Sequence, residues 1–401
     1  MAIMLVCTLY VGAQTSPKSY DSYTGLVMAG YQGWFSTPED GGNRGWYHYQ
    51  GKEGFKPGST NVDLWPDVSE YEKTYESPFT FENGEKARLF SPRDYSTVDT
   101  HFRWMKEYNI DGVFVQRFVV DQKWPLGKAH HDTVLDNAMK AARKYERAVC
   151  VMYDLSGMNA GDEQVVLRDI QQLARKYNLF DHSQCPSYLY HKGKPLVAVF
   201  GMGFNDGRKY GFNETGKIIQ GLKRLGFSVM ISVPGYWRQM ERDTERDARL
   251  HQQIRQCDIL LPWYVGRYNE QSFEAFKQHI LADMRWAEAN QIDFAPLCFP
   301  GFSWHNMHFP RRGPGEEIPR NKGSFFKKQL NFNVSNGAKM IYIAMFDEID
   351  EGTAIFKIAR KVPKASPGSE FVPLERGVSS DHYLKLAGKA SKKLKKKLKI
   401  K

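Results

Sequence analysis

Hydrophobic and polar residues follow two alternating patterns along most of this chain. Short runs rich in apolar and β-branched residues occupy positions 25–35, 111–120, 147–157, 194–203, 226–237, 257–266, 291–304 and 337–348. Between several of these runs, apolar residues recur three and four positions apart, as on one side of an amphipathic helix; examples are residues 97–109, 133–146 and 163–178. Near-continuous apolar strands that alternate with helices are typical of parallel sheets buried on both faces. The pattern therefore predicts eight strand–helix units, which together make a (β/α)8 barrel.

A doubly wound sheet is the alternative architecture. However, no GxGxxG segment follows the first apolar run, and no phosphate-binding loop is visible. The stretch from residue 36 to residue 110 is too long for one crossover, and it is rich in Gly, Pro, Asp and Trp. In a barrel, the loops that follow strands build the functional face. We therefore predict a single α/β domain over residues 20–390, a (β/α)8 TIM barrel with a long first loop.

The net charge of +11 is concentrated at the C-terminal end. From Lys385 to Lys401 there are nine lysines and no acidic residue, so the rest of the chain carries only +2. Small and apolar residues at helical spacing in this stretch, Ala387, Ala390, Leu394 and Leu398, indicate a terminal amphipathic helix. We interpret residues 391–401 as the basic end of that helix, with a solvated lysine face, and we expect no nucleic-acid partner, because no basic–aromatic motif or zinc-finger spacing accompanies the lysines.

The first residues, MAIMLVCTLYVGAQ, form a short apolar run that ends in small residues. This is typical of a signal peptide, here residues 1–13 with cleavage after Ala13, although a charged start is missing. Cys7 as a lipid attachment site is the alternative, but Val6 is not the small residue expected before such a cysteine. We therefore expect an exported protein, periplasmic, extracellular or on the cell surface. No later segment is long and apolar enough for stable membrane insertion, and the other four cysteines lack the spacing of a zinc or redox site.

Aromatic and hydrogen-bonding side chains recur where the predicted strands end. Saccharides present apolar C–H faces and a belt of hydroxyl groups, which such side chains suit. A single tryptophan at a strand end is more often a packing residue, but the recurrence at five of eight strand ends favours a saccharide site. The predicted substrate-binding residues are Tyr31, Gln32, Trp34, Gln116, Arg117, Tyr153, Asp154, Tyr236, Trp237, Trp263, Tyr264, Trp304, His305 and Asp347.

Four carboxylates follow the last apolar run within five residues: Asp347, Glu348, Asp350 and Glu351. Glycoside hydrolysis commonly uses two carboxyl groups, and mutual repulsion keeps one of them protonated near neutral pH. Glu348 and Glu351 are three positions apart, which places them on one face of a turn. Two other interpretations are acids that begin a helix, and a calcium site. Four acids at one strand end exceed what a helix start requires, so we predict Glu348 and Glu351 as catalytic residues.

The segment GAKMIYIAMFDEIDEGT resembles the strand-eight segment of the endo-α-mannosidase family, glycoside hydrolase family 99, and of the related family 71. The family pattern Phe-Asn-Glu-Trp-His-Glu-Gly-Thr is matched at Phe346, Glu348, Glu351, Gly352 and Thr353. It is not matched at positions 347, 349 and 350, where this chain has Asp, Ile and Asp. The segment AGYQGWFSTPEDG also resembles strand one of a related branch that includes proteins labelled xylosidase/arabinosidase.

The resemblance implies a (β/α)8 glycoside hydrolase that retains anomeric configuration and needs no metal or cofactor. Glu348 would help deprotonate the sugar 2-hydroxyl, which attacks C1 to give a 1,2-anhydro intermediate, and Glu351 would be the acid/base. The substrate would be an oligosaccharide or polysaccharide with α-linked mannose-type or related residues. Two alternatives stay open: an exo-acting xylosidase/arabinosidase with conventional double displacement, and a carbohydrate-binding barrel without catalysis. The sugar, the linkage, endo or exo action and the oligomeric state are not determined by the sequence.

Overall fold

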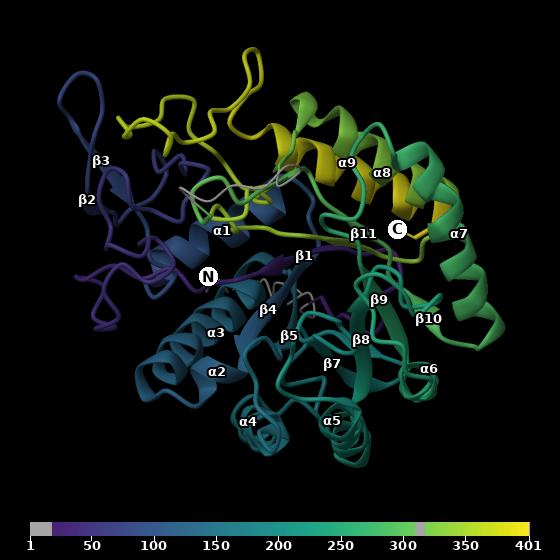
Figure 1. The fold of residues 1–401 in the computed structure, drawn as a ribbon. Coiled ribbons are helices and arrows are strands. Elements are labelled where there is room, and N and C mark those ends of the chain that lie inside the picture. Colours follow the sequence, from purple (N-terminus) through teal and green to yellow (C-terminus); the bar gives the residue numbers. More distant parts are fainter. Residues whose placement is uncertain (1–17, 309–316, 401) are drawn as a thin grey trace, which may run out of the picture.

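Parallel strands form the centre of the molecule and close into a barrel (Figure 1). The computed structural model describes residues 18–308 and 317–400, so the predicted signal peptide with Ala13 and Cys7 lies outside the described residues. The barrel strands are β1 (Val27–Tyr31), β4 (Gly112–Phe118), β5 (Ala148–Asp154), β7 (Lys194–Phe200), β8 (Ser228–Pro234), β9 (Ile259–Trp263), β10 (Asp293–Phe294), β11 (Leu297–Cys298) and β14 (Ile341–Ile343). Their spatial order is β10-β9-β8-β7-β5-β4-β1-β14-β11.

The barrel closes through a strand that is divided into two halves. β10 pairs with β9, whereas β11, two residues further along the chain, pairs with β14. Between the halves, the Ala295 N–H donates to the Leu260 carbonyl at 2.9 Å, and the Pro296 carbonyl accepts from the Tyr342 N–H at 3.0 Å. Proline has no N–H to contribute to a ladder, so Pro296 takes part in this seam through its carbonyl alone. β10 and β11 together are the seventh barrel strand, and β14 is the eighth.

A ring of helices surrounds the strands, one after each barrel strand. These helices are α1 (Tyr95–Glu107), α3 (Pro125–Tyr145), α4 (Glu163–Tyr177), α5 (Phe212–Arg224), α6 (Arg249–Ile254), α7 (Phe273–Ala289), α8 (Ser324–Ser335) and α9 (His382–Leu398). α8 and α9 lie side by side (Figure 1), and Gly388 of α9 lies against the carbonyl of Tyr108 at the end of α1. The predicted (β/α)8 barrel is therefore confirmed, with α9 as its last helix.

The strand residues divide into two cores because successive side chains point to opposite faces of a strand. One set fills the barrel interior and includes Met28, Phe114, Met152, Met230 and Tyr342. The alternate set, rich in valine and isoleucine, faces the helices. This double burial accounts for the near-continuous apolar runs in the sequence. Cys150, Cys185, Cys257 and Cys298 are all buried and free.

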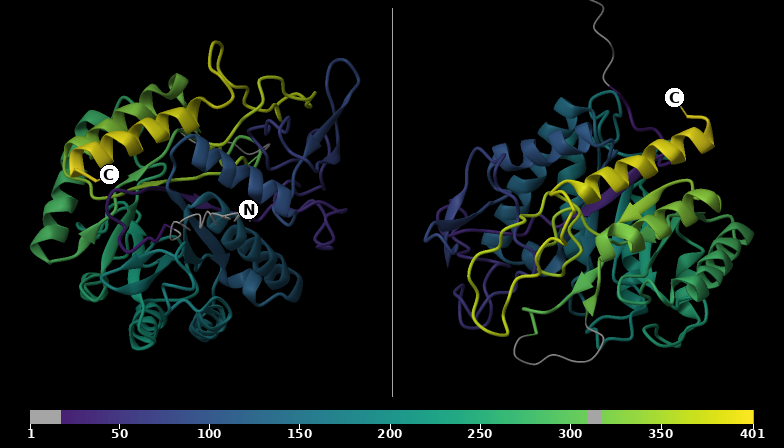
Figure 2. Two further views of the ribbon diagram at one scale, coloured as in Figure 1. Left: turned by 180° about the vertical axis from the view of Figure 1, so that it is seen from behind. Right: turned by 90° about the horizontal axis from the view of Figure 1, so that it is seen from above.

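The remaining elements belong to the connections. The first loop contains the antiparallel pair β2 (Tyr75–Thr80) and β3 (Lys86–Leu89), which projects from the barrel beside the segment that precedes α9 (Figure 2). The N–H groups of Asp63 and Leu64 in this loop donate to the Ile349 carbonyl, each at 3.0 Å, so the loop is attached to the end of strand eight. The short elements are α2 (Val119–Gln122), β6 (Tyr190–His191), β12 (Phe302–Ser303), β13 (Glu317–Ile318) and the 3-10 helix η1 (Asn321–Gly323).

Candidate active site

A cavity of about 700 Å³ opens at the C-terminal ends of the barrel strands. Its wall is formed by residues at strand ends and in the loops that follow. The polar and aromatic lining residues are Gln32, Trp34, Tyr47, His48, Gln116, Phe118, Asp121, Asp154, Ser156, Phe200, Phe204, Asp206, Arg208, Trp263, Arg267, Phe302, Trp304, Glu348 and Glu351. The cavity therefore combines aromatic surfaces with hydrogen-bonding groups, as predicted for the strand ends.

Eight of the sixteen predicted site residues line this cavity: Gln32, Trp34, Gln116, Asp154, Trp263, Trp304, Glu348 and Glu351. They come from strand ends far apart in the sequence. Gln116 lies deep in the barrel, where its Nε2 is 3.3 Å from the Tyr342 hydroxyl. Trp263 packs edge-on against Phe200 with the ring centres 4.9 Å apart. The barrel thus gathers these side chains at one end, although their places in the sequence extend from residue 32 to residue 351.

The predicted residues Tyr31, Arg117, Tyr153 and Tyr264 do not line the cavity. Each follows or precedes a lining residue by one position, so the alternation of side chains along a strand directs it to the helix layer. Arg117 Nε and the Tyr153 hydroxyl donate to Asp169 Oδ2 of α4 at 2.7 and 2.6 Å. The Tyr264 hydroxyl donates to Asp283 of α7 at 2.8 Å, and the Tyr31 hydroxyl is 2.8 Å from Nδ1 of His101 in α1. These four residues fasten strands to helices.

The other four predicted residues outside the cavity wall are Tyr236, Trp237, His305 and Asp347. Tyr236 and Trp237 follow the end of β8, and Trp237 Nε1 donates to Asp283 at 3.1 Å. Tyr236 packs on His279 with ring centres 5.2 Å apart, and its hydroxyl accepts from Arg242 at 2.7 Å. His305 Nδ1 is 2.9 Å from Glu317. Asp347 is fully buried and accepts the N–H groups of Gln32 and Gly33 at 2.8 and 2.9 Å, which joins the ends of strands eight and one.

The two candidate catalytic carboxylates lie on a tight loop after β14. The Glu348 carbonyl accepts from the Ala354 N–H at 3.0 Å, and the Glu351 carbonyl accepts from the Ser303 N–H at 2.8 Å. Gly352, between them and Thr353, has a φ of 66°, and a Cβ there would lie 3.1 Å from the Ser303 nitrogen. Only glycine fits both conditions comfortably. This loop therefore fixes Glu348 and Glu351 at the same cavity wall.

The polar partners of Glu348 and Glu351 differ. The Glu348 carboxylate accepts from Gln32 Nε2 and from the Thr353 hydroxyl. Burial raises the pKa of Glu348 well above its usual value, and the charges of Glu351 and Asp350 act in the same direction, while the two donors oppose them. Burial, and then the charge of Asp350, raise the pKa of Glu351 to about 8 against the opposing indole N–H of Trp304. At neutral pH this pair therefore holds at least one proton.

The two aspartates of the cluster are fully buried and do not line the cavity. Burial raises the pKa of Asp347 to about 7 and that of Asp350 to about 8. Asp350 Oδ2 lies 3.2 Å from Nδ1 of His48, a residue of the first loop that lines the cavity. Burial lowers the pKa of His48 to about 3, so the imidazole is neutral at neutral pH. Asp350 thereby couples the catalytic loop to the first loop.

His48 also stacks on Trp34 at the cavity. The ring centres lie 3.7 Å apart, with an angle of 7° between the ring planes. Phe118 stacks on Trp34 as well, with its ring centre 5.0 Å away. The parts of these three rings that line the cavity are apolar surface, against which a C–H face of a sugar can rest.

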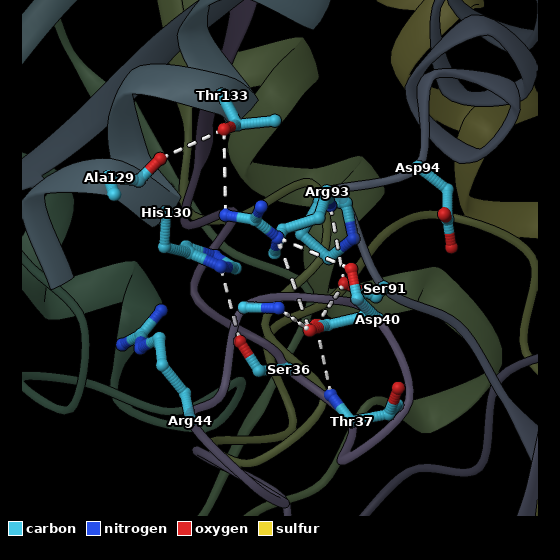
Figure 3. Close-up of polar contacts among 12 residues, drawn as sticks. Ser36, Thr37, Asp40, Arg44, Ser91, Arg93, Asp94, Ala129, His130 and Thr133 are labelled. Carbon is cyan, nitrogen blue, oxygen red and sulfur yellow. Dashed lines mark hydrogen bonds and ion pairs between the residues drawn. The ribbon is translucent and has the colours of Figure 1, made fainter. Parts of the chain in front are cut away.

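A buried polar network holds the first loop in place (Figure 3). Asp40 accepts from the Thr37 N–H at 3.1 Å and from the Ser91 hydroxyl at 2.7 Å. His130 of α3 contacts the Ser36 hydroxyl at 3.1 Å and the Gly33 carbonyl at 2.7 Å. Because both ends of the segment 33–40 are fixed, the following residues are carried to the cavity edge in a defined position.

Several polar lining residues were not predicted from the sequence: Tyr47, His48, Asp121, Asp206, Arg208 and Arg267. Asp121 accepts from the Tyr47 hydroxyl at 3.1 Å and pairs with Arg44 at 3.5 Å and with His131 at 2.9 Å. Arg208 pairs with Asp206 at 2.9 Å, and Arg267 pairs with Asp243. Asp121 lies in the short helix α2, and the other five lie in loops after strands. For Tyr47 and His48, the aromatic-rich first loop was the signal in the sequence that could have indicated them.

Potential metal ligands are spread out in this structure. Within residues 18–308 and 317–400, no group of three or more His, Cys, Asp or Glu side chains is arranged to hold a metal ion.

This chain resembles known proteins in its fold and not in its sequence. No family model matches the chain, and no curated protein matches it in sequence. Two solved structures of the GH99 endo-α-mannosidase from Bacteroides thetaiotaomicron, one in complex with bis-tris-propane, share its fold with TM-scores of 0.65 and 0.66. Their identity to this chain is 17% and 16%, and the matches cover 95% and 94% of this chain and 100% of theirs. A structure described as a glycoside hydrolase-like protein has a TM-score of 0.55 and 12% identity, over 96% of this chain and 97% of its own. The expected likeness to family 99 is therefore confirmed at the level of the fold.

Proposed function

We propose that this protein is a glycosidase that cleaves α-linked mannose-type or related glycans with retention of configuration. One observation carries the proposal: Glu348 and Glu351, from one loop, both line the barrel-end cavity together with aromatic side chains. The fold shared with two endo-α-mannosidase structures supports it, since barrels present their active sites at this end. The fold alone does not assign an activity, so the proposal depends on the carboxylate pair.

The surroundings of the two carboxylates favour different roles. Two donors, Gln32 and Thr353, hold the Glu348 carboxylate, and hydrogen bonds of this kind stabilise an ionised carboxylate. Burial raises the pKa of both carboxyl groups, but two donors oppose the rise at Glu348, whereas only the Trp304 indole opposes it at Glu351. We therefore assign the negative charge to Glu348, as the assisting base, and the proton to Glu351, as the acid.

In the first step, Glu348 accepts the proton of the sugar 2-hydroxyl while O2 attacks C1. The bond from C1 to the leaving oxygen breaks, and Glu351 donates its proton to that oxygen. The products of this step are a 1,2-anhydro sugar, an ionised Glu351 and a protonated Glu348. In the second step, Glu351 accepts a proton from water, which attacks C1 from the face that the leaving group vacated, and O2 takes back its proton from Glu348. Two inversions at C1 give net retention.

Conventional double displacement by a xylosidase/arabinosidase is the second candidate. It is favoured by one feature of this chain, its departure from the family pattern at positions 347 and 350, where aspartates replace the Asn and His of that pattern beside the two glutamates. In that route Glu348 would attack C1 directly and form a covalent glycosyl-enzyme.

The test is a screen of α-mannosyl, xylosyl and arabinofuranosyl substrates with NMR analysis of the first-formed anomer. Glu348→Gln and Glu351→Gln are then compared on a natural glycoside and on an activated aryl glycoside of the same sugar. Positioned proton transfer typically contributes about 100- to 10,000-fold to rate. We expect Glu351→Gln to lose a factor of this size on the natural substrate and much less on the aryl glycoside, because a good leaving group needs little protonation. Glu348→Gln should lose activity on both.

Three results would contradict the proposal. Near-parental rates for both variants on a substrate that the parent cleaves would remove the assignment of the pair. A product with inverted configuration would exclude both retaining routes. Saccharide binding without cleavage of any substrate would favour a binding barrel instead. If cleavage and retention hold, a 2-deoxy substrate separates the routes, because only the 1,2-anhydro route requires the 2-hydroxyl.

A further inference from the structure

The two neighbouring ring helices α8 and α9 contain no acidic residue. On α9 and just beyond it, seven lysines are exposed: Lys385, Lys389, Lys392, Lys393, Lys396, Lys397 and Lys399. α8 adds the exposed Lys327 and Lys328. Solvated helices usually mix charges, because opposite charges three or four positions apart stabilise a helix and like charges destabilise it. On this surface like charges are neighbours instead: lysines lie four positions apart at 385, 389 and 393 and again at 392 and 396.

The lysine face, defined as the exposed lysines of α9 and its end, is held rigidly on the barrel. Ala387, Ala390 and Leu394 are buried, and Gly388 lies against the Tyr108 carbonyl. The Ser391 hydroxyl donates to Asp111 Oδ2 at 2.9 Å, and Lys395 pairs with Asp111. The helix is therefore an integral part of the fold, and its lysines are presented at fixed spacing.

Few of these lysines have an acidic partner. Among the described residues, Lys385 pairs with Asp381 at 2.8 Å, whereas no ion pair joins Lys389, Lys392, Lys396 or Lys399 to an acid. Lys18 lies at the same end of the molecule, within electrostatic reach of Arg147 and Lys395. Three acids, Asp381, Asp111 and Glu270, pair with lysines of this region, namely Lys385, Lys395 and Lys328. The lysines outnumber these acids, so the region carries an excess of positive charge.

The face lies away from the carboxylate cavity. Lys395 contacts Asp111, which precedes β4, and Ile400 lies beside Gly25, which precedes β1. Both points are at the N-terminal ends of the barrel strands, whereas the cavity opens at their C-terminal ends. A partner on the last turns of α9 would therefore leave the cavity open. Ile400 itself is 38% exposed, an apolar side chain at the margin of the charged surface.

We propose that the lysine face binds the surface of a bilayer that contains anionic phospholipid. Clusters of four to eight basic residues on an amphipathic helix attract such surfaces. All nine basic residues of this stretch are lysine, a point charge on a flexible stem, and none is arginine, the residue that recognises individual phosphates in a bidentate way. No tryptophan or phenylalanine interrupts the face to stack on bases. These features favour a diffuse anionic surface over a nucleic acid. The contact is peripheral: within the described residues, no helix combines the length and the hydropathy of a membrane span.

The experiment measures co-sedimentation of the purified protein with vesicles of phosphatidylcholine alone, and of two parts phosphatidylcholine and one part phosphatidylglycerol, at low and high salt. The test variant carries Lys389→Gln, Lys392→Gln, Lys393→Gln and Lys396→Gln. The matched control carries Lys52→Gln, Lys56→Gln, Lys86→Gln and Lys209→Gln, which removes the same charge from exposed positions elsewhere. A third variant replaces the four α9 lysines by arginine.

We expect the parent to bind the phosphatidylglycerol vesicles and to lose this binding at high salt, where screening weakens surface attraction. The α9 variant should lose at least about tenfold in partitioning, since each lysine contributes to binding at an anionic surface. The control and the arginine variant should retain it. Circular dichroism checks that all variants are folded. Equal binding of the α9 variant and the control, no preference for phosphatidylglycerol, or tighter binding to duplex DNA than to the vesicles at the same salt would each overturn the proposal.

Discussion

Four acids within five residues serve four different purposes at the end of strand eight. Asp347 accepts backbone N–H groups and joins two strand ends. Glu348 is held by two side-chain donors, Asp350 faces His48 of the first loop, and Glu351 is exposed to the cavity. The cost of gathering like charges is reduced by protonation, because burial raises the pKa of each of them. Each aspartate can therefore be tested separately from the pair that it supports.

Asp350→Asn should move the alkaline limb of the profile of kcat/KM against pH toward lower pH by roughly half a unit or more. After burial, the charge of Asp350 is the largest cause that raises the pKa of Glu351. Its removal lets Glu351 lose the catalytic proton at lower pH. Asp347→Asn is the matched control, because Asp347 does not act on the pKa of Glu351. The measurement is kcat/KM between pH 5 and 10 for the parent and both variants; an equal displacement by both would contradict the assignment.

Among the secondary-structure elements, the eight strands and their helices could be predicted because burial on both faces leaves a plain apolar signature. Of the predicted site residues, only half line the cavity. Gln116 lines the cavity, whereas the adjacent Arg117 faces the helix layer. Both side chains are polar, so polarity alone does not show which of the two points into the barrel. The divided seventh strand depends on hydrogen bonds across the barrel seam, and His48 is held at the site by contacts with Trp34 and Asp350. Such long-range contacts leave no local pattern.

Helix α9 offers a test in which packing opposes helix propensity. Gly388→Ala would stabilise an isolated helix by roughly 1 kcal/mol. In this fold an added Cβ would lie 1.7 Å from the Tyr108 carbonyl oxygen, a backbone atom that cannot move alone. We therefore expect the substitution to lower the free energy of unfolding by about 1–3 kcal/mol, as overpacking does.

Urea unfolding measures this effect. The control is Lys389→Ala, the adjacent exposed position, which should change the free energy of unfolding by less than about 0.5 kcal/mol. A stabilised Gly388→Ala variant would show that α9 does not pack against α1 as described.

For the molecule as a whole, the first loop connects the other loops of the site, because it contacts the loops after strands seven and eight. Asp63 accepts from the Ser303 hydroxyl at 2.6 Å and from the N–H groups of His305 and Asn306 at 2.9 and 2.8 Å. Its own N–H donates to the Ile349 carbonyl at 3.0 Å. Burial raises the pKa of Asp63 to about 7. The loops after strands one, seven and eight therefore form one buried unit that is rich in carboxyl groups.

This unit predicts how the stability of the whole protein depends on pH. Asp63, Asp347, Asp350 and Glu351 have pKa values of about 7 to 8 in the folded state, so the folded protein keeps protons that the unfolded chain has lost. Their stabilising effect is complete below the unfolded value near 4 and is lost as pH rises through 7 and 8. Buried histidines, such as His101 with a pKa of about 3, act in the opposite sense, but only below their unfolded value of 6.5.

Between pH 7 and 9 the carboxyl groups therefore dominate, and we expect the free energy of unfolding to fall by about 3–4 kcal/mol over this range, at roughly 1.4 kcal/mol per proton and pH unit. Urea titrations at pH 7, 8 and 9 measure it, and Asp350→Asn should reduce the slope. Stability that is constant or rises over this range would contradict the protonated state of the cluster.

The contact of Ile400 with Gly25 brings the two ends of the described chain together on one side of the barrel. Synthesis of the chain could therefore start at a different strand and still give the same order of strands around the barrel. A short linker from residue 400 to residue 18, with new ends between the exposed Ser183 and Gln184, would leave every barrel strand between the same two neighbours. Such a circular permutant should fold and keep the cavity, and it would begin synthesis at the fourth barrel strand, so that the long first loop and the carboxylate loop would both emerge from the middle of the chain.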